Sequence, residues 1–221
     1  MDYFIILEDI LLTKLPKEKF IKFDKFYKLF LENKLIFDHN YRALEIENPS
    51  YADFLSIVKP TKLPPIKNFK TKEGKKYLVH TILHIEYSAV DLALDAALRY
   101  QNMPFEFYRD WLEVANDEIR HFLMLEKLLK ELNGFYGEFE VHKNLFEAMQ
   151  QTPDLLSRMA CIPRYLEANG LDQNPKIMEK LNGGGHFSAA AVEREGVSVQ
   201  QMKDMILNCI EEELKNEGNI A

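Results

Sequence analysis

Apolar residues recur every three or four positions over two long stretches of the chain, which is the pattern of helices packed on other helices. From Lys76 on, the first stretch has a stripe made of Val79, Ile82, Glu86, Ala89, Ala93, Ala96 and Tyr100. The second stretch begins near Pro104, a residue that suits the first turn of a helix. Its stripe consists of Trp111, Val114, Glu118, His121, Leu125, Leu128 and Leu132. The break between the two stretches predicts a turn near Asn102 that joins two long antiparallel helices.

Capping residues and local periodicity predict further helices. We expect them around residues 17–33, 152–169 and 174–181, and from Ser198 to the end of the apolar stripe at Glu213. Residues 1–16 and 34–70 are expected to be irregular, and no segment has a convincing strand pattern. The expected fold class is therefore all-α, with a helical bundle as the architecture.

A proline-rich connector suggests how the chain is divided. Pro60, Pro64 and Pro65 lie within residues 59–70, and proline disfavours helix at the residue before it. We therefore expect residues 1–70 to form an N-terminal extension, helical and irregular, that packs on a bundle domain of residues 71–221.

Composition and charge narrow the class of protein. With 221 residues, 47% apolar and 29% charged, the chain has ordinary globular usage. It has no apolar run long enough for a membrane span or a secretory signal, so a cytoplasmic location is expected. Residues 76–221 carry 14 basic and 24 acidic residues. An acidic body repels phosphate backbones, so a nucleic-acid partner is disfavoured.

Three charged or titratable residues occupy apolar stripe positions, which is costly unless they are paired or bind a metal. Glu86 lies sixteen residues before Asn102, and Glu118 lies sixteen residues after it. In an antiparallel hairpin the two carboxylates therefore lie at the same level, each about 24 Å from the turn. His121 shares the face of Glu118, since residues three apart are neighbours on a helix.

Glu167 is expected to join this group from a third helix. It shares a row with Leu156, Ala160 and Pro163, and an antiparallel third helix brings it to a similar depth. Inward glutamates together with a Glu-x-x-His motif are the pattern that binds two metal ions in a helical bundle. The alternatives are an exposed Glu118–His121 pair, a buried pair answered by an arginine (Arg99, Arg120 or Arg164), and solvated positions for Glu86 and Glu167.

Short motifs between about residues 71 and 181 carry a resemblance to a known family. They are His84-Ile-Glu86, Asp91 to Asp95, Met103-Pro104, Phe107-Tyr108, Asp110 to Leu112, Asp117-Glu118 with His121-Phe122, Tyr136-Gly137, Arg158 to Ala160 with Pro163-Arg164, Leu166 to Ala168, and Gly170 to Asp172. This stretch resembles the ferritin-like family catalogued as domain of unknown function 455. The resemblance implies a four-helix ferritin-like bundle and a di-iron or related two-metal centre.

The same resemblance implies that Glu86, Glu118, His121 and Glu167 are metal ligands. It also implies that Asp117 orients an imidazole, although an exposed helix acid is an equal reading of that residue. His80 and His84 could in principle hold a metal. His84 lies about 200° from Glu86 around the helix, however, so we expect both histidines to form a polar face or to contact the N-terminal segment.

The C-terminal part departs from the family pattern. Ferritin-like bundles usually supply a second Glu-x-x-His motif from the fourth helix, whereas here Glu213 is followed by Asn216. Three arrangements stay open. Glu213, or less plausibly Glu211 or Glu212, completes a histidine-poor site; a partner chain in a homodimer donates ligands; or the bundle holds one ion or none.

The expected function is that of an O₂-using protein with a carboxylate-bridged metal centre. Iron is the expected cofactor, as two ions by resemblance, with manganese or a single ion as variants. Its reaction would be the oxidation or hydroxylation of a small molecule not identified by the sequence, with electrons from an external donor. The alternatives are a non-enzymatic iron-binding protein and a metal-free helical interaction module.

Overall fold

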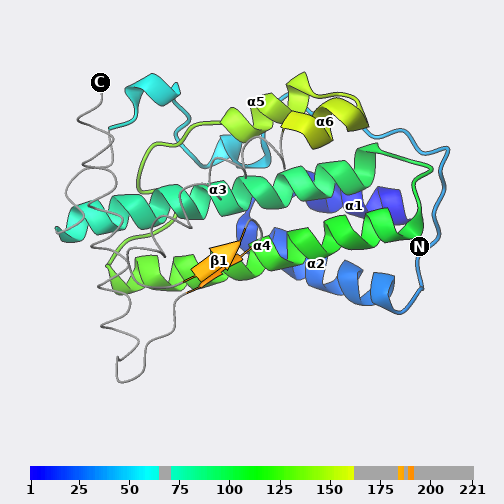
Figure 1. The fold of residues 1–221 in the computed structure, drawn as a ribbon, viewed down its shortest axis with the longest axis horizontal. Coiled ribbons are helices and arrows are strands. Elements are labelled where there is room, and N and C mark those ends of the chain that lie inside the picture. The colour runs from blue at the N-terminus through cyan, green and yellow to red at the C-terminus, as the bar shows by residue number, and fades with distance from the viewer. Residues whose placement is uncertain (65–70, 162–183, 187–188, 192–221) are drawn as a thin grey trace. The chain divides into compact units, whose positions relative to one another are not determined.

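Helices make up most of the computed structural model, which describes residues 1–64, 71–161, 184–186 and 189–191 (Figure 1). The α-helices are α1 (Tyr3–Leu12), α2 (Pro16–Leu31), α3 (Lys72–Arg99), α4 (Phe105–Glu131), α5 (Asn144–Gln151) and α6 (Leu155–Cys161). The chain divides into two compact units, Met1–Gln151 and Thr152–Ala221. The all-α class expected from the sequence is confirmed.

The two long helices of the first unit, α3 and α4, run antiparallel to each other (Figure 1). Thr71 caps α3, and its hydroxyl accepts a hydrogen bond of 3.0 Å from the Gly74 N–H. In the short connection to α4, Asn102 has a φ of +58°, a conformation that asparagine tolerates better than most residues. Pro104 occupies the N-cap position of α4, without a capping hydrogen bond from its side chain. The predicted pair of long helices and the turn near Asn102 are therefore confirmed.

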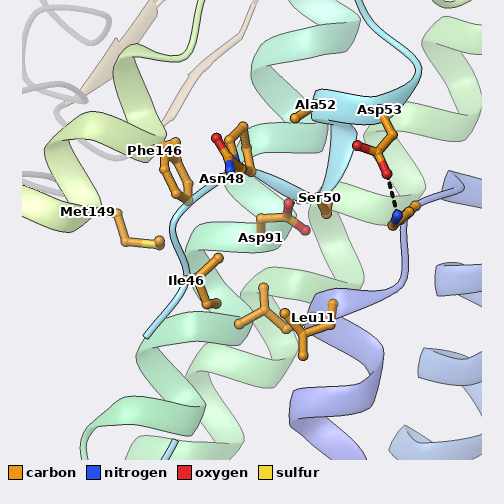
Figure 2. Close-up of a pocket in the computed structure, with 12 residues that line it drawn as sticks. Leu11, Ile46, Asn48, Ser50, Ala52, Asp53, Asp91, Phe146 and Met149 are labelled. Carbon is orange, nitrogen blue, oxygen red and sulfur yellow. Dashed lines mark hydrogen bonds and ion pairs between the residues drawn. The ribbon is translucent and has the colours of Figure 1, made fainter. Parts of the chain in front are cut away.

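The segment from Glu32 to Pro64 contains two short 3₁₀ helices, η1 (Ser50–Asp53) and η2 (Pro60–Lys62). In Figure 2, Ile46 and Ser50 of this segment lie close to Asp91 on α3, opposite Phe146 and Met149 of α5. A short parallel bridge pairs Ile57 with Val141, so this segment is also joined to the chain that precedes α5. It therefore links α1, α3 and α5 into the first unit.

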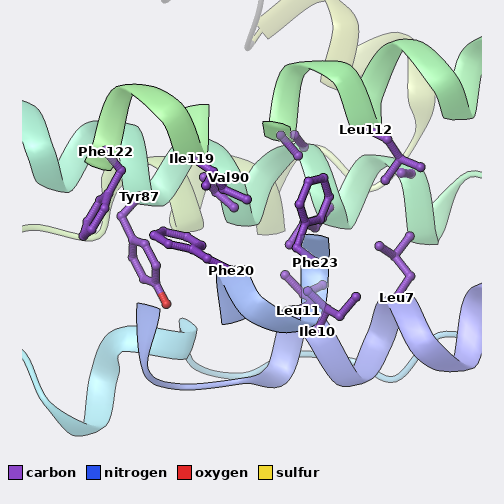
Figure 3. Packing of buried hydrophobic residues seen from close by; sticks show 14 of the residues in the cluster. Leu7, Ile10, Leu11, Phe20, Phe23, Tyr87, Val90, Leu112, Ile119 and Phe122 are labelled. Carbon is purple, nitrogen blue, oxygen red and sulfur yellow. The ribbon is translucent and has the colours of Figure 1, made fainter. Parts of the chain in front are cut away.

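A single aromatic-rich core holds the first unit together (Figure 3). The buried Leu7 and Ile10 of α1 and Phe23 of α2 meet Val90 of α3 and Leu112 of α4. Phe20 and Phe122 make an edge-to-face contact with ring centroids 5.1 Å apart. Such pairs add about 0.5–1.5 kcal/mol beyond the apolar area that they bury. The four helices α1 to α4 thus share one core, which makes this unit a helical bundle.

The stripe predicted for α4 is wrong by one residue. The buried positions of this helix are Tyr108, Leu112, Ala115, Ile119, Phe122 and Leu129, and all of them from Leu112 onward follow a predicted stripe position by one. In contrast, Val114 is 40% exposed, and Glu118 and His121 are half-buried. Aromatic side chains of α1 and α2 pack against the adjacent face of α4, as in the Tyr3–Tyr108 and Phe20–Phe122 contacts, and bury that face.

Several other expectations need correction. Residues 3–12 form α1 instead of an irregular segment, and α5 was not expected at all. The second unit contains a small antiparallel hairpin of β1 (Gly184–His186) and β2 (Ala189–Ala191), where no strand was expected. Helix α6 lies within the predicted helix 152–169, and the predicted helices 174–181 and from residue 198 lie outside the described residues. The domain boundary near residue 70 stays a prediction.

Candidate metal centre

Three of the four residues expected to bind metal converge between α3 and α4. Glu86, Glu118 and His121 each offer one ligand atom, and these atoms all lie within 4.8 Å of one another. His121 Nδ1 is 3.1 Å from Glu118 Oε2 and 3.6 Å from Glu86 Oε2. Glu167 lies outside the described residues. We call Glu86, Glu118 and His121 the acid–histidine cluster.

The hairpin of α3 and α4 explains why these residues meet. Because the connection near Asn102 fixes the register of the two helices, residues equally distant from it face each other. Glu118 and His121 lie one turn apart on α4, which lets the imidazole reach the carboxylate on its own helix. The geometry worked out from the spacing of Glu86 and Glu118 therefore matches the structure.

The environment of the cluster favours a cation. The side chains of Glu86 and Glu118 are each only 22% exposed, and that of His121 is 39% exposed. Burial, and then the hydrogen bond and negative charge of Glu118, raise the pKa of Glu86 to about 8. Two carboxylates this close cannot both be ionised near neutral pH without a compensating positive charge. A proton, a protonated imidazole or a metal ion can supply that charge.

The two arginines of the described chain that could have neutralised the cluster bind other residues. Arg99 donates a hydrogen bond of 2.6 Å to Asp95 within α3. Arg120 lies 3.2 Å from Asp117, whose side chain is about half exposed. Asp117 thus lies at the surface, in agreement with the alternative that it is an exposed acid of the helix. Arg164 lies outside the described residues, as do Glu211, Glu212, Glu213 and Asn216.

His80 and His84 lie apart from the cluster and serve the packing of α3. His84 Nε2 donates to the carbonyl of His142 at 2.7 Å, so its neutral ring accepts from the Tyr136 hydroxyl at 2.9 Å through Nδ1. Its ring also contacts Tyr51 of the N-terminal segment, with centroids 4.8 Å apart. Burial lowers the pKa of each histidine to about 4. The expected contact with the N-terminal segment is thus seen for His84.

Sequence reasoning missed a second polar group in the first unit. The fully buried Lys19 of α2 donates hydrogen bonds to Asp91 of α3 and, at 2.8 Å, to the Ser50 hydroxyl. Ser50 in turn donates to the other carboxylate oxygen of Asp91 at 2.6 Å. A signal was present, because Lys19 is in register with the apolar stripe that continues at Phe23 and Phe30.

Fold and cluster define a class: helical-bundle proteins with an acid–histidine cluster between two antiparallel helices. The chain matches a family model described as "Protein of unknown function (DUF455)" over residues 12–194. It belongs to this family, and the match extends beyond residues 71–181, which carry the short motifs described above.

The chain is similar to one curated relative, whereas no solved structure matches it. The chain is 40% identical over 144 residues to an "Uncharacterized protein" of Haemophilus influenzae, an alignment that covers 62% of this chain. The chain spans about half the length of that curated relative. No solved structure matches the chain. Among the described residues, no helix combines the length and the apolar character that crossing a membrane requires.

Proposed function

We propose that the acid–histidine cluster binds iron and that the protein is a ferritin-like, O₂-using oxidase or hydroxylase of a small molecule. The observation that carries this proposal is the convergence of two carboxylates and one imidazole within 4.8 Å. Carboxylate oxygens together with imidazole nitrogen suit Fe(II) and Mn(II) better than the thiolate-preferring metals. A two-ion site would need further ligands, of which Glu167 is the first candidate.

The donor set fits such an ion on chemical grounds. Glu86 holds a proton near neutral pH because Glu118 and burial disfavour its charge, and a cation would release that proton. In its neutral form, His121 offers the lone pair of a ring nitrogen beside both carboxylates. Three protein ligands leave coordination positions for other groups, as catalytic metal sites require.

All three residues of the cluster would hold the ion in this proposal. His121 would supply a nitrogen ligand beside the carboxylates of Glu118 and Glu86, whose nearest oxygens lie 3.1 and 3.6 Å from its Nδ1. Iron held here would supply the redox chemistry with O₂ that oxidation or hydroxylation needs, with electrons from an external donor. Partial burial of the carboxylates limits the water that competes for them.

Metal binding to variants of the full chain tests the proposal. We expect the native protein to bind Fe(II) and to melt at a higher temperature with it, because a ligand of the folded state stabilises that state. Glu118→Ala and His121→Ala should each weaken binding at least about tenfold. Glu113→Gln is the matched control, since Glu113 is an exposed acid on the same helix. Unchanged iron content in Glu118→Ala would show that the cluster is not the site.

Oxygen consumption separates the enzyme from the alternatives. A protein that binds iron through these residues but reduces no O₂ with any donor is an iron-binding protein without this activity. A protein that binds neither iron nor manganese, and whose melting temperature does not respond to them, is a metal-free helical module. Each result would replace the proposed function with a defined alternative.

A further inference from the structure

A cavity of about 190 Å³ lies beside Asp91 in the first unit (Figure 2). Its walls come from several elements: Leu11 from α1, Ile46 from the segment before α3, and Phe146 and Met149 from α5. These walls are mainly apolar. Asp91 and Ser50 form the buried polar end, and the exposed Lys14, Asn48 and Asp53 are the polar groups of the rim (Figure 2). Apolar walls with a few convergent polar groups are the usual composition of a small-molecule site.

This cavity is separate from the acid–histidine cluster. Asp91 comes five residues after Glu86, which places it about 140° away around α3 at about 100° per residue. Neither Glu86 nor the other two members of the cluster lines the cavity. A molecule bound here would therefore contact a different face of α3, and the inference does not depend on the proposed function.

The polar end of the cavity can accept a hydrogen bond. Asp91 is 8% exposed, and its two oxygens accept from Lys19 and from Ser50. A carboxylate has about four acceptor positions, so these two donors leave acceptor capacity on Asp91. Ser50 has less remaining hydrogen-bonding capacity, because its hydroxyl already accepts from Lys19 and donates to Asp91.

The charges around the cavity cancel. Asp91 forms an ion pair with Lys19, and Asp53 forms one with Lys14 at the exposed rim (Figure 2). A charged ligand would therefore lose its hydration without gaining an unpaired charge of opposite sign. The complementary occupant is neutral, with an apolar body that contacts the walls and one donor that reaches Asp91.

The volume limits the size of that occupant. A cavity of about 150 Å³ lined by leucine, isoleucine and phenylalanine binds benzene. The larger cavity here, about 190 Å³, has room for a ring with one or two further non-hydrogen atoms. We propose that it binds a small neutral molecule, with an apolar ring or branched chain, whose single hydroxyl or N–H group donates a hydrogen bond to Asp91.

A titration of the full chain with three related probes tests this site. Benzyl alcohol has the proposed ring and donor, toluene lacks the donor, and benzoate replaces it with a negative charge. Met149 lines the cavity, so its ¹³C-labelled methyl group, assigned with Met149→Leu, reports binding by NMR. We expect a dissociation constant of about 1 mM or below for benzyl alcohol. Toluene should bind about 2- to 10-fold more weakly, and benzoate more weakly still.

Rim variants show whether the probe enters this cavity. Ala52 lines the cavity from η1 and is half-buried, so Ala52→Trp should block it and weaken benzyl alcohol at least about tenfold. Leu31→Trp, at the exposed end of α2 and outside the lining, should bind as the native protein does. Circular dichroism confirms that each variant is folded. If Ala52→Trp fails to fold, Leu12→Trp replaces it, since Leu12 also lines the cavity and is 41% exposed.

Three outcomes would overturn the inference. The first is an unmoved Met149 methyl signal at benzyl alcohol concentrations up to about 20 mM, far above the expected dissociation constant. The second is equal affinity for toluene and benzyl alcohol, which would mean that Asp91 accepts no hydrogen bond from the ligand. The third is binding that a folded tryptophan variant at the rim leaves unchanged.

Discussion

The buried ion pair between Lys19 and Asp91 allows a quantitative prediction about stability. The Lys19 side chain is fully buried and that of Asp91 is 11% exposed, so Asp91→Asn leaves a buried ammonium group beside a neutral amide. Removing one partner of a buried pair costs about 3–5 kcal/mol. This cost has an upper limit, because Lys19 can lose its proton instead of staying buried as an unpaired ammonium group. From the ordinary lysine pKa of 10.5, neutralising the amine at about pH 7 costs about 5 kcal/mol.

The limit set by deprotonation gives the variant a pH dependence of known sign. Where the penalty for the buried ammonium in Asp91→Asn reaches this limit, Lys19 loses its proton in the folded state and keeps it in the unfolded state, so the unfolded state binds more protons. The free energy of unfolding then rises with pH, by up to about 1.4 kcal/mol per unit, until the ordinary pKa of lysine is reached. At about pH 9 the largest possible penalty falls to about 2 kcal/mol.

The double variant Lys19→Met/Asp91→Leu should recover the lost stability. Burial is the largest influence on both groups: it lowers the pKa of Lys19 and raises the pKa of Asp91, in each case against the effect of the partner. Desolvation thus outweighs pairing, and two apolar side chains of similar volume should be nearly neutral or stabilising. We expect the double variant to lie within about 1.5 kcal/mol of the native protein or above it.

Urea denaturation followed by far-ultraviolet circular dichroism measures these changes. Lys28→Met is the matched control, because Lys28 and Asp24 form an exposed pair with side chains 69% and 62% accessible. Its removal should change the free energy of unfolding by less than about 0.5 kcal/mol. A loss below about 1 kcal/mol in Asp91→Asn at about pH 7, or a loss that does not shrink at about pH 9, would refute the reasoning.

Three further predictions concern packing, capping and acid stability. Leu112→Ala should cost about 2–5 kcal/mol because Leu112 is fully buried, whereas Leu123→Ala, at a position 50% exposed on the same helix, should cost far less; urea midpoints compare them. Thr71→Ala removes the cap of α3 and should lower the free energy of unfolding by about 1 kcal/mol. Thr71→Ser keeps a hydroxyl at this position and should retain most of the stability that the cap contributes. Burial lowers the pKa of His80 to about 4 from 6.5, so protons favour the unfolded state below about pH 6.5, by up to about 3 kcal/mol near pH 4. Urea titrations at several pH values give the slope of the free energy of unfolding against pH, and His80→Gln should reduce that slope by the equivalent of about one proton. A slope equal to that of the native protein would contradict the assignment, and His39→Gln is the control.

The regular apolar period of α2 was predictable, whereas the short apolar run that forms α1 was not. In α2 the alternation of lysines and phenylalanines gives a clear period, and its predicted bounds agree with Pro16–Leu31 within two residues. In α1 the residues Phe4-Ile5-Ile6-Leu7 form an unbroken apolar run, which does not distinguish a short buried helix from another structure. The available local signal was Asp2, a good capping residue, whose carboxylate accepts a hydrogen bond of 3.0 Å from the Ile5 N–H.

The buried stripe of α4 shows a second limit of sequence patterns. Two adjacent stripes of this helix, one through Leu112 and Ile119 and one through Trp111 and Leu125, both contain apolar residues at helical spacing. Periodicity alone does not say which stripe lies deeper, because this depends on the elements that pack against each face. Here α1 and α2 supply the aromatic side chains that bury the first stripe, and their packing is not encoded within α4.

The acid–histidine cluster and the Lys19–Asp91 pair differ in how far each could be predicted from the sequence. For Glu86 and Glu118, the helices that carry them are joined by one short turn, so equal distances from Asn102 are enough to pair them. Lys19 and Asp91 are 72 residues apart on helices that no single turn connects, and no count along the chain aligns them. A charged residue within an apolar stripe therefore indicates that a compensating group exists. Only a hairpin also says which residue it is, because the turn fixes the register.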